Sequence, residues 1–151
     1  MKVKEIMSAN VLTVKKDTTI EEIAHILANN NISGVPVVDE DGKIIGIVTQ
    51  KDLLYKDVEP RFPAMVEILG SLVFLKGAKQ HNEELKKIVG TKAEDIMTTI
   101  VYTVNEDSPV ENAAQLMVER DISRVPVIKD GKLAGIVSRA DVVKYIAKRM
   151  E

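Results

Sequence analysis

The sequence predicts an α/β (α+β) fold in which two β-α-β-β-α repeats pack pseudo-symmetrically as one module. The first observation is an internal repeat, because residues 6–38 align with 96–128 and residues 42–52 with 131–141, with 19 identities in 44 aligned positions. A repeat of fixed period defines the architecture before any single residue is interpreted. The second is that strand, helix, hairpin and helix patterns follow one another in the same order in both copies. Each unit would leave one sheet face uncovered, which a second unit can cover.

The first helix of each copy is predicted from its start signals. Thr18 with Glu21, and Ser108 with Glu111, have the spacing of capping boxes, in which a hydroxyl and a carboxylate satisfy unpaired backbone N–H groups. We expect the first helix to end at Asn29-Asn30-Asn31, and Glu119-Arg120-Asp121 occupies the matching place in the second copy. A short β-favouring run precedes each helix, at residues 11–14 and 101–104.

A hairpin and a second helix complete each copy. Two apolar runs (35–38 and 44–48, then 125–128 and 133–137) flank a glycine-containing turn, which indicates an antiparallel hairpin. The helix between the first two strands implies a right-handed parallel crossover. The last helix is expected to open at Thr49 or Ser138.

The predicted domains are 1–56 for the first copy, 57–91 for a helical connector and 92–151 for the second copy. Apolar residues recur at helical spacing in the connector. They are compatible with a helix that packs on the core and with a dimerisation or partner-docking surface, and the sequence leaves both interpretations open.

Composition excludes several classes of function. The formal net charge is −2, with basic and acidic residues interspersed, so we expect no broad nucleic-acid surface. The chain contains no cysteine, which leaves no disulfide and no thiolate metal site. No stretch is apolar enough for a signal peptide or a membrane span, and we therefore expect a cytoplasmic protein with no membrane partner. His25 and His81 have no neighbouring histidine, so no metal site is predicted.

Two short motifs could carry binding chemistry. Thr49-x-x-Asp52 and Ser138-x-x-Asp141 each sit where a strand ends and a helix begins. Either motif alone is best interpreted as a helix cap. A helix N-terminus also attracts phosphate, and a carboxylate one turn in can accept hydrogen bonds from two ribose hydroxyls. The pair of motifs therefore suits a nucleotide better than free phosphate, which the carboxylate would repel.

The ordered set of motifs resembles tandem cystathionine-β-synthase-type (CBS) domains, as found in small stand-alone CBS-pair proteins. The resemblance covers residues 1–56 and 92–148. It rests on Ile-Met, Thr-Val-x-x-Asp, Ile-Ser-x-Val-Pro-Val and Gly-Ile-Val-Thr/Ser-x-x-Asp, which each copy contains in that order.

The resemblance implies binding of AMP, ADP or ATP in two clefts between the repeats, with no catalytic cofactor. By the family pattern, one cleft would combine Thr49 and Asp52 with residues of the second copy: Val101, Tyr102, Ile122 and Ser123. The other would combine Ser138 and Asp141 with residues of the first copy: Val11, Leu12, Ile32 and Ser33. Arg124 replaces Gly34 and Arg139 replaces Gln50, and arginine is the better phosphate partner. We expect the Ser138/Asp141 cleft to prefer phosphorylated adenosine.

The expected function is regulation rather than catalysis. An adenine nucleotide would shift the geometry of the repeats in an energy-sensing module and pass the change to a target protein. Family analogy implies a homodimer. The alternatives are an enzyme acting on the nucleotide, a module that binds S-adenosylmethionine, and a structural partner-binding protein in which the two motifs are only caps.

Overall fold

The computed structural model describes residues 1–55 and 91–151, so the predicted connector lies almost entirely outside the described residues. The described chain packs as two compact units. Unit 1 comprises Met1–Leu12, Glu40–Ile44 and Ile100–Glu151, and unit 2 comprises, of the described residues, 13–39, 45–55 and 91–99. Mixed helices and strands agree with the predicted α+β class.

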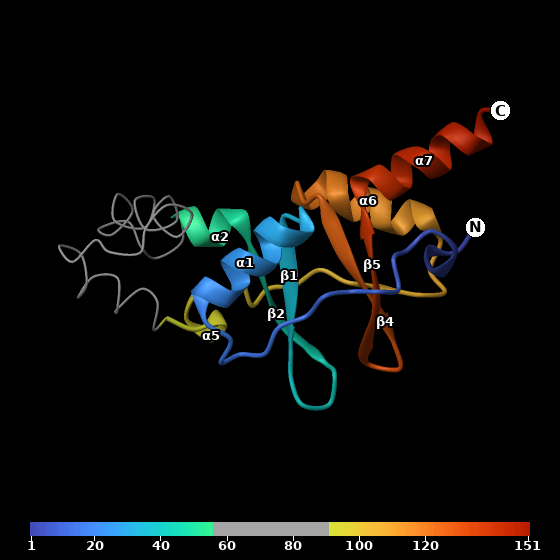
Figure 1. The fold of residues 1–151 in the computed structure, drawn as a ribbon. Helices are drawn as coiled ribbons and strands as arrows, with labels where there is room; N and C mark the ends of the chain where they lie inside the picture. Colours follow the sequence, from blue (N-terminus) through green and yellow to red (C-terminus); the bar gives the residue numbers. More distant parts are fainter. Residues whose placement is uncertain (56–90) are drawn as a thin grey trace. The chain divides into compact units, whose positions relative to one another are not determined.

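Unit 1 contains a three-stranded sheet in the order β3-β4-β5. Figure 1 labels β4 and β5, which form its hairpin. The strands are β3 (Val104–Asn105), β4 (Arg124–Lys129) and β5 (Lys132–Ser138). β3 is parallel to β4, and β4 is antiparallel to β5, so the parallel pairing across the predicted crossover and the antiparallel hairpin are confirmed in this copy. Helix α6 (Val110–Arg120) contacts β4, and α7 (Arg139–Arg149) contacts both α6 and β5.

Unit 2 has the same order of elements with a smaller sheet. β1 (Gly34–Val38) pairs with β2 (Ile44–Thr49), α1 (Ile20–Asn30) precedes them and α2 (Gln50–Tyr55) follows. Val14 forms a parallel bridge to Val37. The predicted strands at 11–14 and 101–104 are therefore too long, because in each run only the last residue pairs with the neighbouring strand.

The predicted capping boxes of α1 and α6 are wrong. Thr19 is the N-cap of α1 and accepts a hydrogen bond from the Glu22 backbone N–H, whereas the Thr18 hydroxyl accepts one from Lys15. The N-cap of α6 is Pro109, which has no side-chain acceptor. Both helices begin one residue later than a cap at position 18 or 108 implies. Their ends are as predicted, with Asn31 and Asp121 in the left-handed conformation.

The segment that opens each copy, called its leading segment below (residues 3–8 and 93–98), packs on the other copy. The 3-10 helix η1 (Val3–Glu5) belongs to unit 1, where the Val3 backbone N–H donates to Ser108 at 2.8 Å. Helix α5 (Ala93–Ile96) belongs to unit 2, where the Ala93 N–H donates to Thr18 at 2.8 Å. Val3 and Ala93 are both fully buried. The two repeats of the sequence therefore do not coincide with the two packing units, because each unit includes the leading segment of the other repeat.

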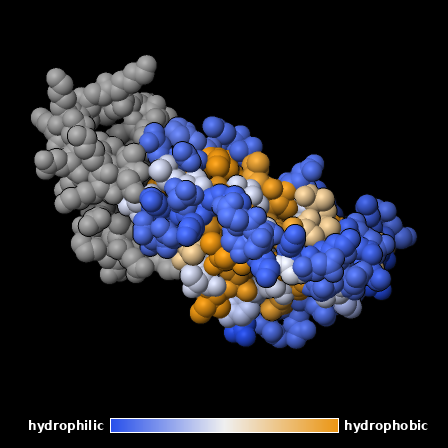
Figure 2. All heavy atoms as spheres, turned by 90° about the horizontal axis from the view of Figure 1, so that it is seen from below, coloured by the Kyte–Doolittle hydropathy of each residue, from blue (hydrophilic) through white to orange (hydrophobic). Residues whose placement is uncertain are grey.

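Each unit has its own apolar core. The core of unit 1 includes Val3, Val110 and Val127, and that of unit 2 includes Ile23, Val37 and Ala93, each at 2% exposure or less. Hydrophobic residues also reach the surface among hydrophilic ones on the face drawn in Figure 2. None of the helices in the two described ranges is long and apolar enough to cross a membrane.

Two aligned glycines allow the leading segments to approach the sheets. A Cβ on Gly46 would lie 2.5 Å from the Met97 sulfur. A Cβ on Gly135 would lie 2.5 Å from the Met7 sulfur and 2.8 Å from the Ser8 backbone oxygen. Ser8 is held in place by two backbone hydrogen bonds with Ile136, at 2.9 and 3.0 Å.

We expect Gly135→Ala to destabilise the protein more than Gly46→Ala. At Gly135 the new methyl group meets backbone, which cannot move without breaking the Ser8–Ile136 pair. At Gly46 the three atoms nearest to the new methyl group all belong to the Met97 side chain. Gly135→Ala should reduce the free energy of unfolding by about 1–3 kcal/mol, in the range of overpacking. Urea unfolding of both variants measures this, and equal losses would contradict the expectation.

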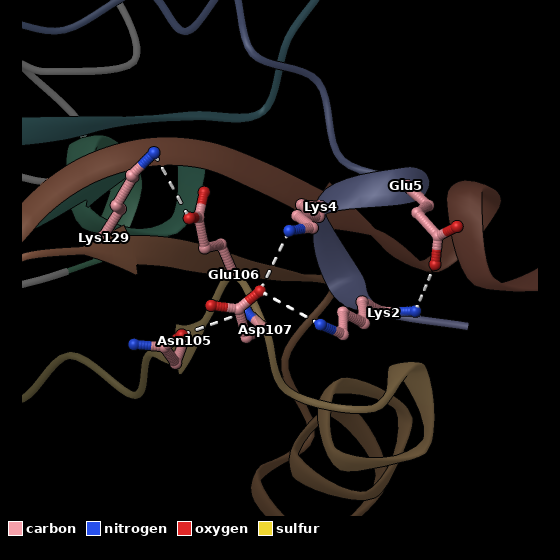
Figure 3. A network of polar contacts seen from close by, with 7 residues as sticks. All are labelled: Lys2, Lys4, Glu5, Asn105, Glu106, Asp107 and Lys129. Atoms are coloured by element: carbon pink, nitrogen blue, oxygen red, sulfur yellow. Dashed lines mark hydrogen bonds and ion pairs between the residues drawn. The ribbon is translucent and has the colours of Figure 1, made fainter.

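A polar network ties the N-terminus to the residues before α6 (Figure 3). The Lys4 ammonium lies 3.0 Å from the Asp107 carboxylate, and that of Lys2 lies 3.5 Å from it. The hydrogen bond and positive charge of Lys4 lower the pKa of Asp107, and Asp107 in turn raises the pKa of Lys4. Lys129 pairs with Glu106 at 3.5 Å. The network holds η1 against unit 1, but its exposure to solvent keeps it weak.

The Asp107 contribution should disappear in acid. Because its folded-state pKa lies below the ordinary 3.8, the stabilisation is present above pH 3.8 and is lost as pH falls through the lower value. Asp107→Asn should lower the melting temperature slightly at pH 7 and low salt, and by a smaller amount at pH 3 or in high salt. Thermal unfolding at each condition measures the effect. The expectation fails if the loss at pH 3 equals that at pH 7.

Candidate functional site

The junction between β5 and α7 holds the second predicted motif in a fixed geometry. Ser138 is the N-cap of α7, and its hydroxyl accepts a hydrogen bond from the Asp141 N–H at 3.2 Å. The Asp141 Oδ2 accepts one from the Ser138 N–H at 2.9 Å. The Arg139 N–H donates to the Ser123 carbonyl at 3.0 Å. Ser123, another predicted site residue, therefore lies beside the start of α7.

The junction between β2 and α2 is built in the same way. The Thr49 N–H donates to Asp52 Oδ2 at 2.9 Å, and the Asp52 N–H donates to the Thr49 hydroxyl at 3.2 Å. The Gln50 N–H donates to the Ser33 carbonyl at 2.9 Å. The interpretation of both motifs as caps is therefore correct for their local structure. A cap can still bind a ligand through whichever oxygens and donors remain available.

Positive charge gathers at the α7 junction. Arg124 lies directly across from Ser138 in the β4–β5 register. Burial lowers the pKa of Arg124, and the nearby charge of Arg139 lowers it further. Arg139 pairs with Asp121 at 3.2 Å, whereas Arg124 has no ion pair within residues 1–55 and 91–151. An anion placed here would relieve the repulsion between the two guanidinium groups.

The predicted site residues divide between the two units. Ser138, Asp141, Arg124, Arg139 and Ser123 come together in unit 1. Thr49, Asp52 and Ser33 come together in unit 2. The remaining residues are distributed as follows: Val11, Leu12, Val101, Tyr102 and Ile122 in unit 1, and Ile32 in unit 2. The pairing of each motif with residues of the opposite copy stays a prediction.

Two contacts near the predicted site residues were not predicted from the sequence. The Thr98 hydroxyl donates to Asp52 Oδ1 at 3.0 Å. Its position was recognisable, because Thr98 and its aligned residue Ser8 directly follow the Ile-Met that opens each copy. The second contact is a cation–π pair in which the Arg120 guanidinium lies 4.6 Å from the centre of the Tyr102 ring. Nothing in the spacing of these two residues indicates that they meet.

No metal centre forms from the part of the chain that the structure describes, since its His, Asp and Glu side chains nowhere gather in threes. His25 is exposed on α1, and His81 lies outside the described residues.

The comparison with protein families gives a direct match. The model of the CBS domain matches residues 3–59 and again residues 93–148. The chain belongs to the CBS domain family. A 32% identical relative from Methanocaldococcus jannaschii, of uncharacterised function, aligns over 97% of this chain and 91% of its own length.

Solved CBS structures share the fold. A structure of CBSX2 in complex with AMP is 27% identical, with a TM-score of 0.74 over 99% of this chain and 98% of that one. The CBS domain pair of the protein MJ0100, in complex with 5′-methylthioadenosine and S-adenosyl-L-methionine, is 31% identical, with a TM-score of 0.70 over 99% and 98%.

Some CBS relatives are much longer enzymes. The L-aspartate semialdehyde sulfurtransferase of Methanocaldococcus jannaschii is 34% identical over 141 residues, which are 93% of this chain but 22% of the enzyme. CBS-pair proteins are generally regulatory modules. Because this chain aligns with only 22% of the enzyme, the enzyme's activity does not carry over to it.

Proposed function

We propose that this CBS pair is a regulatory module that binds a phosphorylated adenosine (AMP, ADP or ATP) at the Ser138–Asp141 junction. The observation that carries the proposal is the meeting of Asp141, Arg124 and Arg139 at the start of α7. The helix start thus carries a carboxylate that can accept ribose hydroxyls, and two arginines that can hold phosphate lie on the adjoining backbone: Arg139 is the first residue of α7, and Arg124 lies across from Ser138. The complex of the similar CBSX2 with AMP supports this ligand class.

The electrostatics of the junction favour a charged phosphate over an uncharged substituent on the ribose. Helix α7 has 11 residues, and its N-terminus adds partial positive charge to that of the two arginines. Each arginine can form two parallel hydrogen bonds with phosphate oxygens, a geometry that lysine cannot reproduce.

S-adenosylmethionine is the second candidate ligand. The MJ0100 domain pair was solved with it and with 5′-methylthioadenosine. Both would satisfy a ribose-binding carboxylate. The positive sulfonium, however, would face Arg124 and Arg139, which disfavours this ligand relative to AMP.

The regulatory mechanism that we propose is a population shift. A ligand that binds one arrangement of the repeats more tightly than another changes their relative populations by its difference in affinity. The change would reach a target protein, with a homodimer as the functional assembly.

Asp141→Asn separates ligand binding from capping. The asparagine carbonyl oxygen can still accept from the Ser138 N–H, so the helix start should persist. Its amide group would present donors to the ribose hydroxyls in place of an acceptor. AMP affinity should fall about tenfold or more at unchanged melting temperature. Isothermal titration with AMP, ATP and S-adenosylmethionine measures this change.

Asp130→Asn is the matched control for the loss of one negative charge. Asp130 lies in the β4–β5 turn with φ of 51°, a conformation that asparagine also adopts readily. The control should bind AMP as the parent does. If the parent binds none of the three ligands, the proposed function is wrong.

Arg124→Gly tests the preference for phosphate. Glycine restores the residue found at the aligned position 34 of the first copy. We expect binding of AMP and ATP to weaken about tenfold or more, and binding of uncharged adenosine to change little, because the lost interaction is with phosphate. Titration with the three ligands measures this, and equal weakening for all three would point to a structural role instead.

A further inference from the structure

The two motif aspartates differ in how many of their hydrogen-bonding sites are already used. Asp52 accepts three hydrogen bonds: from the Thr49 N–H, from the Thr49 hydroxyl at 3.2 Å and from the Thr98 hydroxyl at 3.0 Å. Asp141 accepts one, from the Ser138 N–H. Within the two described ranges, Asp141 Oδ1 has no donor.

This difference decides which aspartate can bind a ribose. A carboxylate offers about four acceptor sites, and the two vicinal hydroxyls of a ribose need two of them. Asp141 retains about three sites by this count and Asp52 about one. Asp141 can therefore accept both hydroxyls, whereas Asp52 can accept only one while the Thr98 contact persists.

Burial reinforces the difference. Asp52 is 6% exposed and is the one buried charged residue in the described part of the chain. Asp141 is partly exposed. A buried carboxylate with satisfied oxygens has little to gain from a ligand, because the ligand must replace a hydrogen bond that already exists.

Of the two additional hydrogen bonds that Asp52 accepts, one comes from the Thr49 hydroxyl of its own motif, and the other comes from Thr98. Thr98 and Ser8 occupy the same place in the two copies, and both pair with the second strand of a hairpin, Thr98 with Ile47 and Ser8 with Ile136. The Thr98 hydroxyl reaches the aspartate of its unit. The Ser8 side chain is exposed and forms no hydrogen bond with Asp141.

We propose that Thr98 is a specificity-determining residue that closes the Asp52 motif to ribose and leaves Asp141 as the ribose-binding aspartate. This inference rests on the proposed function, since it assigns the adenosine ligand to one of two similar motifs. It gives a second reason for the ligand to prefer the Asp141 motif, and this reason is independent of the arginines, because the arginines would bind phosphate and Asp141 would bind ribose. The expected stoichiometry is one adenosine ligand per chain.

The decisive experiment removes the Thr98 hydroxyl in a chain whose Asp141 motif is disabled. Asp141→Asn alone should show at least about a tenfold loss of AMP affinity. Adding Thr98→Val, which keeps the shape of the side chain but not its hydroxyl, frees one acceptor of Asp52. The double variant should bind AMP about tenfold more tightly than Asp141→Asn. Titration gives affinity and stoichiometry, and circular dichroism checks the fold.

Two further variants complete the test. Thr98→Ser retains a hydroxyl, so in the Asp141→Asn background it should not restore binding. Ser8→Ala in the parent should leave both affinity and stoichiometry unchanged, because the Ser8 hydroxyl does not contact Asp141. If Thr98→Val fails to fold, Thr98→Ala in the same background takes its place.

The outcomes separate the two proposals. No AMP binding by the parent would overturn the proposed function. Binding by the parent, abolished in Asp141→Asn and not recovered with Thr98→Val or Thr98→Ala, would overturn the role of Thr98 alone. The same role is overturned if the parent already binds two ligands, or if removing the Thr98 hydroxyl weakens binding, since the hydroxyl would then serve the ligand.

Discussion

The reciprocal hydrogen bonds at the two strand-to-helix junctions constrain the rest of the structure. At each junction a hydroxyl accepts from the aspartate N–H, and the aspartate accepts from the backbone N–H of the hydroxyl-bearing residue. These bonds end the strand, start the helix and fix the carboxylate in one orientation. The same geometry that satisfies the helix start therefore also determines which carboxylate oxygen remains available to a ligand.

The repeats share a backbone frame but not the same chemistry. Gly34 becomes Arg124, Gln50 becomes Arg139, and Thr98 stands where the other unit has Ser8. The first two changes add positive charge at one junction. The third removes a carboxylate acceptor at the other junction. Both effects support the proposal that a phosphorylated nucleoside binds at Asp141, although they would act on different parts of that ligand.

The exchange of leading segments makes the two copies depend on each other. Met7 and Ser8 pack on Gly135 of the second copy, and Met97 packs on Gly46 of the first. This arrangement brings Thr98 to Asp52, although 46 positions separate them in the chain. In the proposal made above, a residue of the second copy's leading segment thus sets a ligand-binding property of the first motif.

The sequence by itself determined the repeat, the order of elements, the crossover and hairpin of the second copy, and the family. These features follow from local patterns, because glycine turns, apolar periodicity and strand-to-helix motifs act over a few residues. The caps of α1 and α6 were misplaced by one residue: at α1 two adjacent threonines offer the same capping hydroxyl, and α6 begins after Pro109, which has no side-chain acceptor to mark it as a cap. Only the tertiary structure decided which leading segment packs on which sheet and which hydroxyl reaches Asp52. Those contacts join residues far apart in sequence, where burial and close approach at Gly46 and Gly135 select the partner.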